Sequence, residues 1–154
     1  MKLLPVIAVA LALTPAVATA ATKTPSYVPG MGEIMGATQM RHSKLWFAGN
    51  AGNWKLANYE LSEIGEGLED AVKYYPLFKG KPVSVMIRHY TAQPLANLDR
   101  AIAAGSPKQF ALAFDKLTHA CNSCHRAADH GYIVIKRPGR LPYTNQVFTA
   151  AKPH

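Results

Sequence analysis

The sequence predicts an all-α protein, an antiparallel four-helix bundle with an extended C-terminal tail. Apolar residues recur at helical spacing through most of the chain between about residues 30 and 130. Segments rich in Gly, Pro and Asn divide this region into four stretches, and helix-start signals precede two of them. From about residue 132 the composition changes to β-branched residues, prolines and aromatics, which predicts an extended tail lying on the bundle.

The first helix is expected from about Met31 to Ala48. Its apolar stripe takes Met31, Ile34, Met35, Thr38, Leu45 and Trp46. The run Gly49-Asn50-Ala51-Gly52 is a stop-and-turn signal, and Asn53 is a suitable N-cap for the helix that follows.

The second helix, from Trp54 to about Tyr75, has the clearest pattern in the chain. Its face consists of Trp54, Ala57, Leu61, Ile64, Gly65, Leu68, Val72 and Tyr75. Leu56 lies off this stripe and is expected to be exposed. The acidic residues Glu60, Glu63, Glu66, Glu69 and Asp70 are expected on a solvated side. Gly65 lies on the packing face, where the missing side chain leaves room for a neighbouring helix or a haem edge; of the two, contact with a neighbouring helix is slightly favoured.

The third segment follows a loop at 76–82 and is expected to be broken. One piece would run from Val83 to about Tyr90, and a second would restart near Pro94 and continue to Ala104. The reason is that proline fits a first helical turn but not a helix interior. A kink or a two-piece helix is therefore predicted.

The fourth helix begins with a capping box, Ser106-Pro107-Lys108-Gln109, with Pro107 at the first helical position. Its inward residues are Phe110, Ala113, Phe114, Leu117 and Cys121. It is expected to stop around 129–131. In the tail, Ile133 and either Ile135 or Val134 are the expected anchors.

The N-terminus has the pattern of a secretory signal peptide over residues 1–20. Lys2 supplies the positive charge, an apolar run spans 3–13, and Ala18-Thr19-Ala20 is a small-residue cleavage site. The apolar run is too short for a spanning helix, which needs about 20 residues. Residues 21–154 are therefore expected to form a single exported domain in the periplasm, with no stable membrane insertion after cleavage.

The only two cysteines lie in a pentapeptide, Cys121-Asn-Ser-Cys124-His125, that is the attachment motif for c-type haem. On a helix, two residues three apart share a face, so both thiols can reach the vinyl groups on one side of a porphyrin. His125 follows Cys121 by four residues and lies on the same stripe, from which its imidazole can reach the iron. We expect one haem c, attached through Cys121 and Cys124, with His125 as the proximal ligand.

Three other uses of the cysteine pair remain open. A redox-active dithiol lacks the βαβ pattern that usually presents such a pair. A zinc site needs about four ligands, and His119 and His130 would lie about 120–140° around a helix from His125. A structural disulfide is the third, because export places the cysteines in an oxidising compartment.

The formal net charge is +8, and it falls to +7 without Lys2. Two haem propionates would lower it further, to about +5. This modest positive balance suits an acidic redox partner. It does not favour nucleic acid, because the chain has no basic run and no pattern of arginines between aromatics.

A C-terminal attachment motif with no methionine after it resembles the class II c-type cytochromes, the cytochrome c-prime and cytochrome c-556 group. The five methionines are Met1, Met31, Met35, Met40 and Met86. The resemblance covers about residues 30–130. It implies a four-helix bundle that binds haem in its last helix, with the group on the other side of the iron supplied by the first. The tail at 132–154 is an addition to the family pattern.

If the first helix supplies the distal ligand, Met35 is the expected residue. At about 100° per residue, Met31 and His42 lie within about 40° of Met35, whereas Met40 points about 140° away. The iron lies level with His125, near the end of the fourth helix, and in an up-down-up-down bundle that end faces the start of the first. This favours Met35, then Met31, with His42 deeper in the core or near a haem edge.

Two functions follow from these expectations. With Met35 bound to iron, the protein would be a one-electron carrier between periplasmic redox partners. With an open, apolar distal side, it would be a five-coordinate haem protein that binds NO or CO. An enzyme is not expected, because His42 alone does not make a distal acid–base pair. The resemblance also allows a homodimer, because bundles of this type often pair through their first two helices, and exposed aromatics around Trp46 and Trp54 would permit such pairing.

Overall fold

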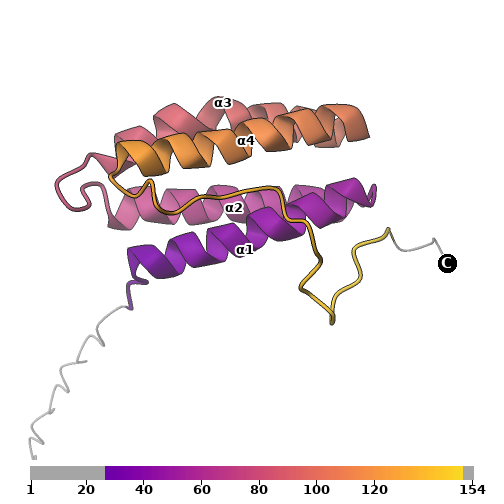
Figure 1. The fold of residues 1–154 in the computed structure, drawn as a ribbon, viewed down its shortest axis with the longest axis horizontal. Helices are drawn as coiled ribbons and strands as arrows, with labels where there is room; N and C mark the ends of the chain where they lie inside the picture. The colour runs from indigo at the N-terminus through magenta and orange to yellow at the C-terminus, as the bar shows by residue number, and fades with distance from the viewer. Residues whose placement is uncertain (1–26, 151–154) are drawn as a thin grey trace, which may run out of the picture.

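The computed structural model describes residues 27–150 and has an all-α fold, as the sequence predicts. The described residues contain four long helices, and Figure 1 shows that they lie side by side and that successive helices run in opposite directions. They are α1 (Met31–Asn50), α2 (Trp54–Tyr74), α3 (Val83–Ala103) and α4 (Pro107–Ala127). Each helix packs along the next one in the chain, and α1 and α4 form the loosest neighbouring pair.

The helix boundaries confirm the capping signals read from the sequence. The Asn53 side chain accepts a hydrogen bond from the Leu56 N–H at 3.2 Å, and the Ser106 hydroxyl accepts one from the Gln109 N–H at 3.4 Å. Gly105, which ends the third helical segment, has a positive φ of 59° that favours glycine. These local interactions place the two turns at one end of the bundle.

The predicted break in the third segment is wrong, because α3 continues through Pro94. Ile87 and Thr91 precede Pro94, Leu98 and Ile102 follow it, and all four are buried on one face of the helix. This packed face spans the proline and holds both halves in line. A break there would expose the apolar side chains of one half of this face. The free-energy cost of that exposure is larger than the cost of the one backbone hydrogen bond that proline cannot donate.

Helix α2 differs from its sequence-based description at three positions. Glu60 is 1% exposed, so it does not lie on the solvated side; it forms an ion pair with Arg41 of α1 at 3.2 Å. Leu56 is partly buried and packs against the core. The close approach to a neighbour occurs at Gly67, where a Cβ would lie 2.7 Å from the Thr38 hydroxyl oxygen, whereas a Cβ at Gly65 would have no neighbour within 4 Å.

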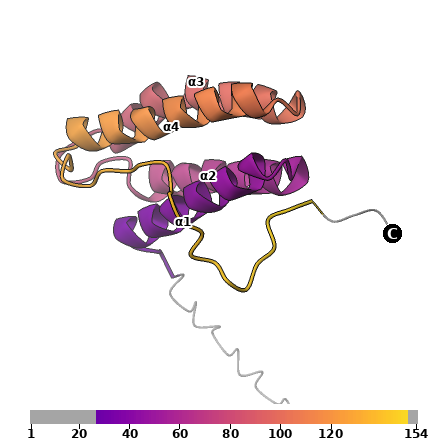
Figure 2. The same cartoon turned by 45° about the vertical axis from the view of Figure 1, so that its right-hand side comes forward.

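After α4 the chain forms an extended segment over residues 131–150, which we call the strap, and this confirms the expected tail. Figures 1 and 2 show the strap leaving the end of α4 and passing along α1. The Arg137 guanidinium pairs with Asp115 of α4 at 2.6 Å and lies 4.1 Å above the ring of Trp46 of α1. Farther along, Phe148 is buried.

The residues expected to anchor the strap are only partly those that do so. Ile133 is 41% exposed and Val134 is 72% exposed, whereas Ile135 is half-buried. The strap is instead held by hydrogen bonds to its backbone, by Arg137 and by Phe148. Its backbone has no partner in a sheet, so hydrogen bonds from side chains supplement the apolar anchors Phe148 and Ile135.

Trp46 and Trp54 are less exposed than the homodimer expectation assumed. Trp46 lies beneath Arg137 of the strap, and Trp54 packs edge-on against Phe110 with ring centroids 5.9 Å apart. Both indoles pack against the bundle core. They therefore offer little free aromatic surface for a second copy of the chain.

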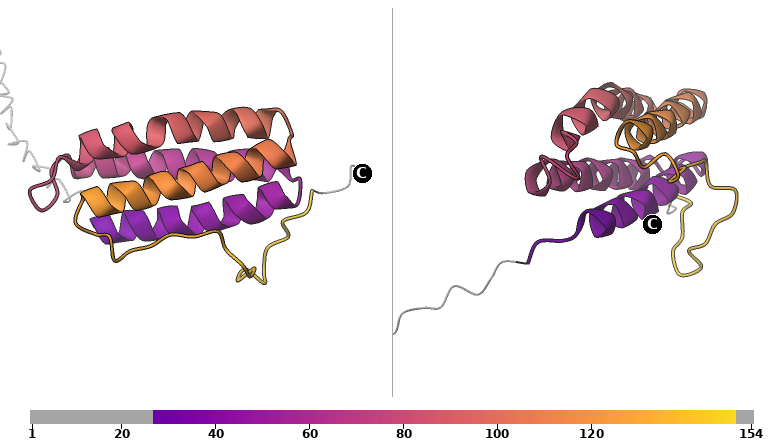
Figure 3. Two further views of the ribbon diagram at one scale, coloured as in Figure 1. Left: turned by 45° about the horizontal axis from the view of Figure 1, so that its top comes forward. Right: turned by 60° about the vertical axis from the view of Figure 1, so that its left-hand side comes forward.

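The signal peptide predicted at residues 1–20 lies outside the described residues. Within residues 27–150, none of the helices combines the length and the apolar character needed to cross a bilayer. Figure 3 shows both ends of the bundle, with the start of α1 beside the end of α4. This is the arrangement that an up-down-up-down bundle requires.

Candidate functional site

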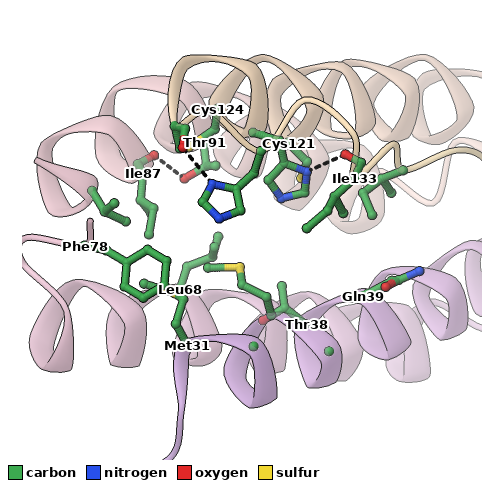
Figure 4. Close-up of a pocket in the computed structure, with 18 of the residues that line it drawn as sticks. Met31, Thr38, Gln39, Leu68, Phe78, Ile87, Thr91, Cys121, Cys124 and Ile133 are labelled. Atoms are coloured by element: carbon green, nitrogen blue, oxygen red, sulfur yellow. Dashed lines mark hydrogen bonds between the residues drawn. The ribbon is translucent and has the colours of Figure 1, made fainter. Parts of the chain in front are cut away.

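A cavity of about 310 Å³ lies at the end of the bundle where α1 begins and α4 ends. All four helices and the strap contribute to its walls, which are largely apolar. Figure 4 shows Cys121 and Cys124 on the α4 wall, with Met31 and Thr38 of α1 on the wall opposite and Leu68 and Phe78 at one side. A pocket of this size, apolar with a few polar groups, is typical of a cofactor site.

The two cysteines of the motif lie one turn apart on α4, line this cavity together and are not bridged to each other. Burial, and to a smaller extent the neighbouring Cys124, raises the pKa of the Cys121 thiol to about 11. Burial also raises the pKa of Cys124. Both groups are therefore thiols rather than thiolates near neutral pH.

These features bear on the other uses of the pair. A redox-active dithiol needs a thiol with a lowered pKa, and here both pKa values are raised. For zinc, no group of three or more His, Cys, Asp or Glu residues within 27–150 is placed to hold an ion. A structural disulfide between Cys121 and Cys124 stays an alternative, because the two cysteines lie three residues apart on the same cavity wall.

His125 belongs to the same wall and has a defined hydrogen-bond partner. Its Nδ1 lies 2.9 Å from the backbone carbonyl oxygen of Ile133 in the strap. Because a carbonyl can only accept, Nδ1 carries the proton and donates. In the neutral imidazole, Nε2 then holds the lone pair that binds a metal. Histidines that bind metals usually have such a backbone acceptor at the other ring nitrogen.

On the opposite wall, α1 contributes Met31, Met35 and His42, as the helical spacing predicts. Met40, which the spacing excluded, is not among the cavity residues; its side chain is 37% exposed. Met31 and Met35 are partly buried against the core. Two thioether sulfurs are thus available on the wall that faces Cys121, Cys124 and His125.

His42 is buried, with 5% of its surface exposed, and burial lowers its pKa to about 4. Its Nε2 lies 2.8 Å from the Thr118 hydroxyl oxygen. That hydroxyl donates to the Phe114 carbonyl at 2.9 Å, so it accepts from the His42 Nε2–H. His42 is therefore a neutral imidazole in a fixed tautomer. Its partner Thr118 lies about one helical turn before Cys121 on α4.

The structure adds two residues that sequence reasoning did not assign to the site. His130 lines the cavity although its angular position on a continued helix pointed away from His125. The reason is that α4 ends at Ala127, and Asp129, with a φ of 60°, turns the chain back. Asn122, between the two cysteines, hydrogen-bonds to the strap. An earlier predicted end of the fourth helix, at residue 127, would have placed His130 at the site. No signal in the sequence pointed to the contact between Asn122 and the strap.

The residues present fit a covalently attached haem. Two thiols and one imidazole come from one wall, with soft thioether donors across an apolar cavity. Comparisons with known protein families, with curated proteins and with solved structures found no match. The assignment of a cofactor therefore depends on the geometry and chemistry of this site.

Proposed function

We propose that the chain is an exported c-type cytochrome that carries one electron between redox partners in the periplasm. Cys121 and Cys124 attach one haem c, and His125 is the proximal iron ligand. The observation that carries this proposal is the hydrogen bond from the His125 Nδ1–H to the Ile133 carbonyl, beside two unbridged thiols on one cavity wall. The chemistry that a bound haem supplies is reversible one-electron exchange at iron.

The hydrogen bond supports iron ligation by His125 because it uses Nδ1 and leaves Nε2 as the ring nitrogen that can bind a metal. With Nδ1 committed to a backbone carbonyl, the Nε2 lone pair is available, and the ring is held in one orientation. The following segment could have left this histidine unpaired at the surface. Instead, the strap supplies an acceptor at 2.9 Å.

The thiols support covalent attachment because each can add across a vinyl C=C bond. In each addition a sulfur–carbon bond forms, the thiol hydrogen passes to the neighbouring vinyl carbon, and no oxidant is consumed. Both cysteines must be reduced for this step, and both are unbridged. A non-haem bundle closed by a Cys121–Cys124 disulfide is the corresponding alternative.

For the other side of the iron we propose Met35 as the ligand, with Met31 next. Met35 is on the α1 wall of the cavity, one turn into the helix, and its thioether is a soft ligand suited to haem iron in electron carriers. The alternative for Met35 is that it only fills core space, as most helical methionines do.

A second function, binding of NO or CO at a five-coordinate haem, is favoured by the character of the α1 wall. Met31, Gly32, Met35 and Gly36 make the first turns of that wall open and apolar, and Thr38 and Gln39 follow as polar but uncharged residues. Among the cavity residues of α1, His42 is the one with an ionisable side chain, and its Nε2 already forms a hydrogen bond with Thr118. Absorption spectra of the oxidised and reduced protein separate the two functions, since Met ligation gives a low-spin iron.

The partner that this proposal requires is a redox protein, and the formal net charge of +7 without Lys2 favours an acidic one. Recognition of nucleic acid and an enzymatic activity are not part of the proposal. A homodimer stays a prediction to be tested by the mass of the haem-loaded protein in solution.

The decisive experiment is expression of the full chain with a haem-attachment system. The protein should keep its colour through acid–acetone extraction, and its intact mass should rise by one haem over residues 21–154. His125→Ala should lose the native proximal coordination, whereas His119→Ala, at an exposed position on the same helix, should not. Colourless protein that holds a Cys121–Cys124 disulfide would contradict the proposal.

A further inference from the structure

The strap and Asn122 form a device that acts on the proximal side of the site. We infer that Asn122 clamps the strap and that the strap, through the Ile133 carbonyl, sets the orientation and donor strength of His125. This inference rests on the proposed haem function. Asn122 and Ile133 are positioning residues, since they act through His125 and have no assigned contact with the cofactor.

The clamp consists of two hydrogen bonds made by one side-chain amide. Asn122 Nδ2 donates to the Ile135 carbonyl at 2.8 Å, and Asn122 Oδ1 accepts from the Ile135 N–H at 2.7 Å. The amide thus satisfies both backbone groups of one strap residue, as a neighbouring strand would do. Its position between Cys121 and Cys124 ties this contact directly to the attachment motif.

Two residues before the clamp, the strap meets His125. The Ile133 carbonyl accepts from the His125 Nδ1–H at 2.9 Å. The turn that leads there is held by the His130 N–H on the His125 carbonyl at 2.7 Å and by the Ile133 N–H on the His130 carbonyl at 2.9 Å. The clamp at Ile135 closes the far side of this turn, so the Ile133 carbonyl is fixed from both directions.

The physical consequence concerns the Nε2 lone pair. A carbonyl that accepts from Nδ1–H increases the basicity of the imidazole and fixes its plane. A more basic proximal ligand stabilises ferric over ferrous iron and lowers the reduction potential. Loss of the clamp should loosen the carbonyl, weaken this hydrogen bond and raise the potential.

The test compares Asn122→Ala with Ser123→Ala, a matched change at the other variable position of the motif. Ser123 accepts a hydrogen bond from Arg126 of its own helix and has no hydrogen bond to the described strap residues. Two quantities are measured on the full chain: the reduction potential of the haem-loaded protein, and the rate of tryptic cleavage after Lys136 and Arg140 in the exposed part of the strap.

Asn122→Ala should raise the potential and speed cleavage, and Ser123→Ala should leave both at the wild-type values. Equal potentials for the two haem-loaded variants overturn the inference. If Asn122→Ala does not mature, Ile135→Pro removes the N–H that the clamp uses from outside the motif, and it should raise the potential likewise; an unchanged potential again overturns the inference.

Failure of the proposed function gives a different result. In that case the wild type itself carries no haem, and the clamp is tested only by the rate of tryptic cleavage in the strap. Faster cleavage in Asn122→Ala than in Ser123→Ala then supports the clamp, and equal cleavage overturns it.

Discussion

Replacing His42 with glutamine should remove a pH dependence of folding stability that this side chain creates. His42 is 5% exposed and bonded to Thr118, and burial lowers its pKa from 6.5 to about 4. In the unfolded chain the same imidazole has its ordinary pKa. Between these two values the unfolded state binds more protons than the folded one, so folding loses stability as the pH falls.

The magnitude follows from the two pKa values. The contribution of His42 is complete above about pH 7, and at pH 5 it has fallen by about 2 kcal/mol. Near pH 4 the loss reaches about 3 kcal/mol, beyond which both states are protonated. Glutamine does not titrate, has nearly the size of histidine, and its amide can donate to the Thr118 hydroxyl oxygen.

The measurement is the free energy of unfolding in urea for the wild type and His42→Gln at several pH values from 8 to 4. Glu60, whose pKa burial raises, titrates in both proteins, so its effect cancels in the difference. We expect the difference between the two proteins to change by about 2 kcal/mol between pH 7 and pH 5. Parallel pH profiles would refute the conclusion that His42 is buried as a neutral imidazole.

Met35→Ala should convert a low-spin haem spectrum to a high-spin one, whereas Met40→Ala, outside the cavity, should not. A wild type that is already high-spin and binds CO readily would favour the gas-binding function. Gly65→Ala should stabilise the protein by about 1 kcal/mol in thermal unfolding, because the helix gains alanine at an open position. Gly67→Ala should lack this gain, since its Cβ would meet the Thr38 hydroxyl at 2.7 Å; equal shifts for both would contradict this packing. Electron transfer to an acidic partner should slow as ionic strength rises, and a flat salt dependence would make the positive charge incidental.

The starts of α2 and α4 and the site-facing positions were predictable because they depend on neighbours within one turn. Asn53 and Ser106 cap the next turns through N–H groups three residues away. Cys121, Cys124 and His125 share a wall because residues three and four apart share a helical face. The same rule separated Met31 and Met35 from Met40.

Errors arose where the neighbour was distant in sequence. Glu60 looked solvated because its partner, Arg41, belongs to another helix. Pro94 looked like a break because the packing on both sides of it is not visible in local propensity. The error at His130 had a local cause: its direction was worked out for a continued helix, whereas α4 ends at Ala127.

The sequence by itself predicted the all-α bundle, the side-chain caps of α2 and α4, the extended tail and the common face of Cys121, Cys124 and His125. Tertiary structure alone decided how those donors are held. The Asn122 clamp joins a residue of α4 to Ile135, 13 residues later in the strap. The His42–Thr118 hydrogen bond joins residues 76 apart. Periodicity and capping report interactions within about one helical turn, whereas such contacts exist only after the chain has packed.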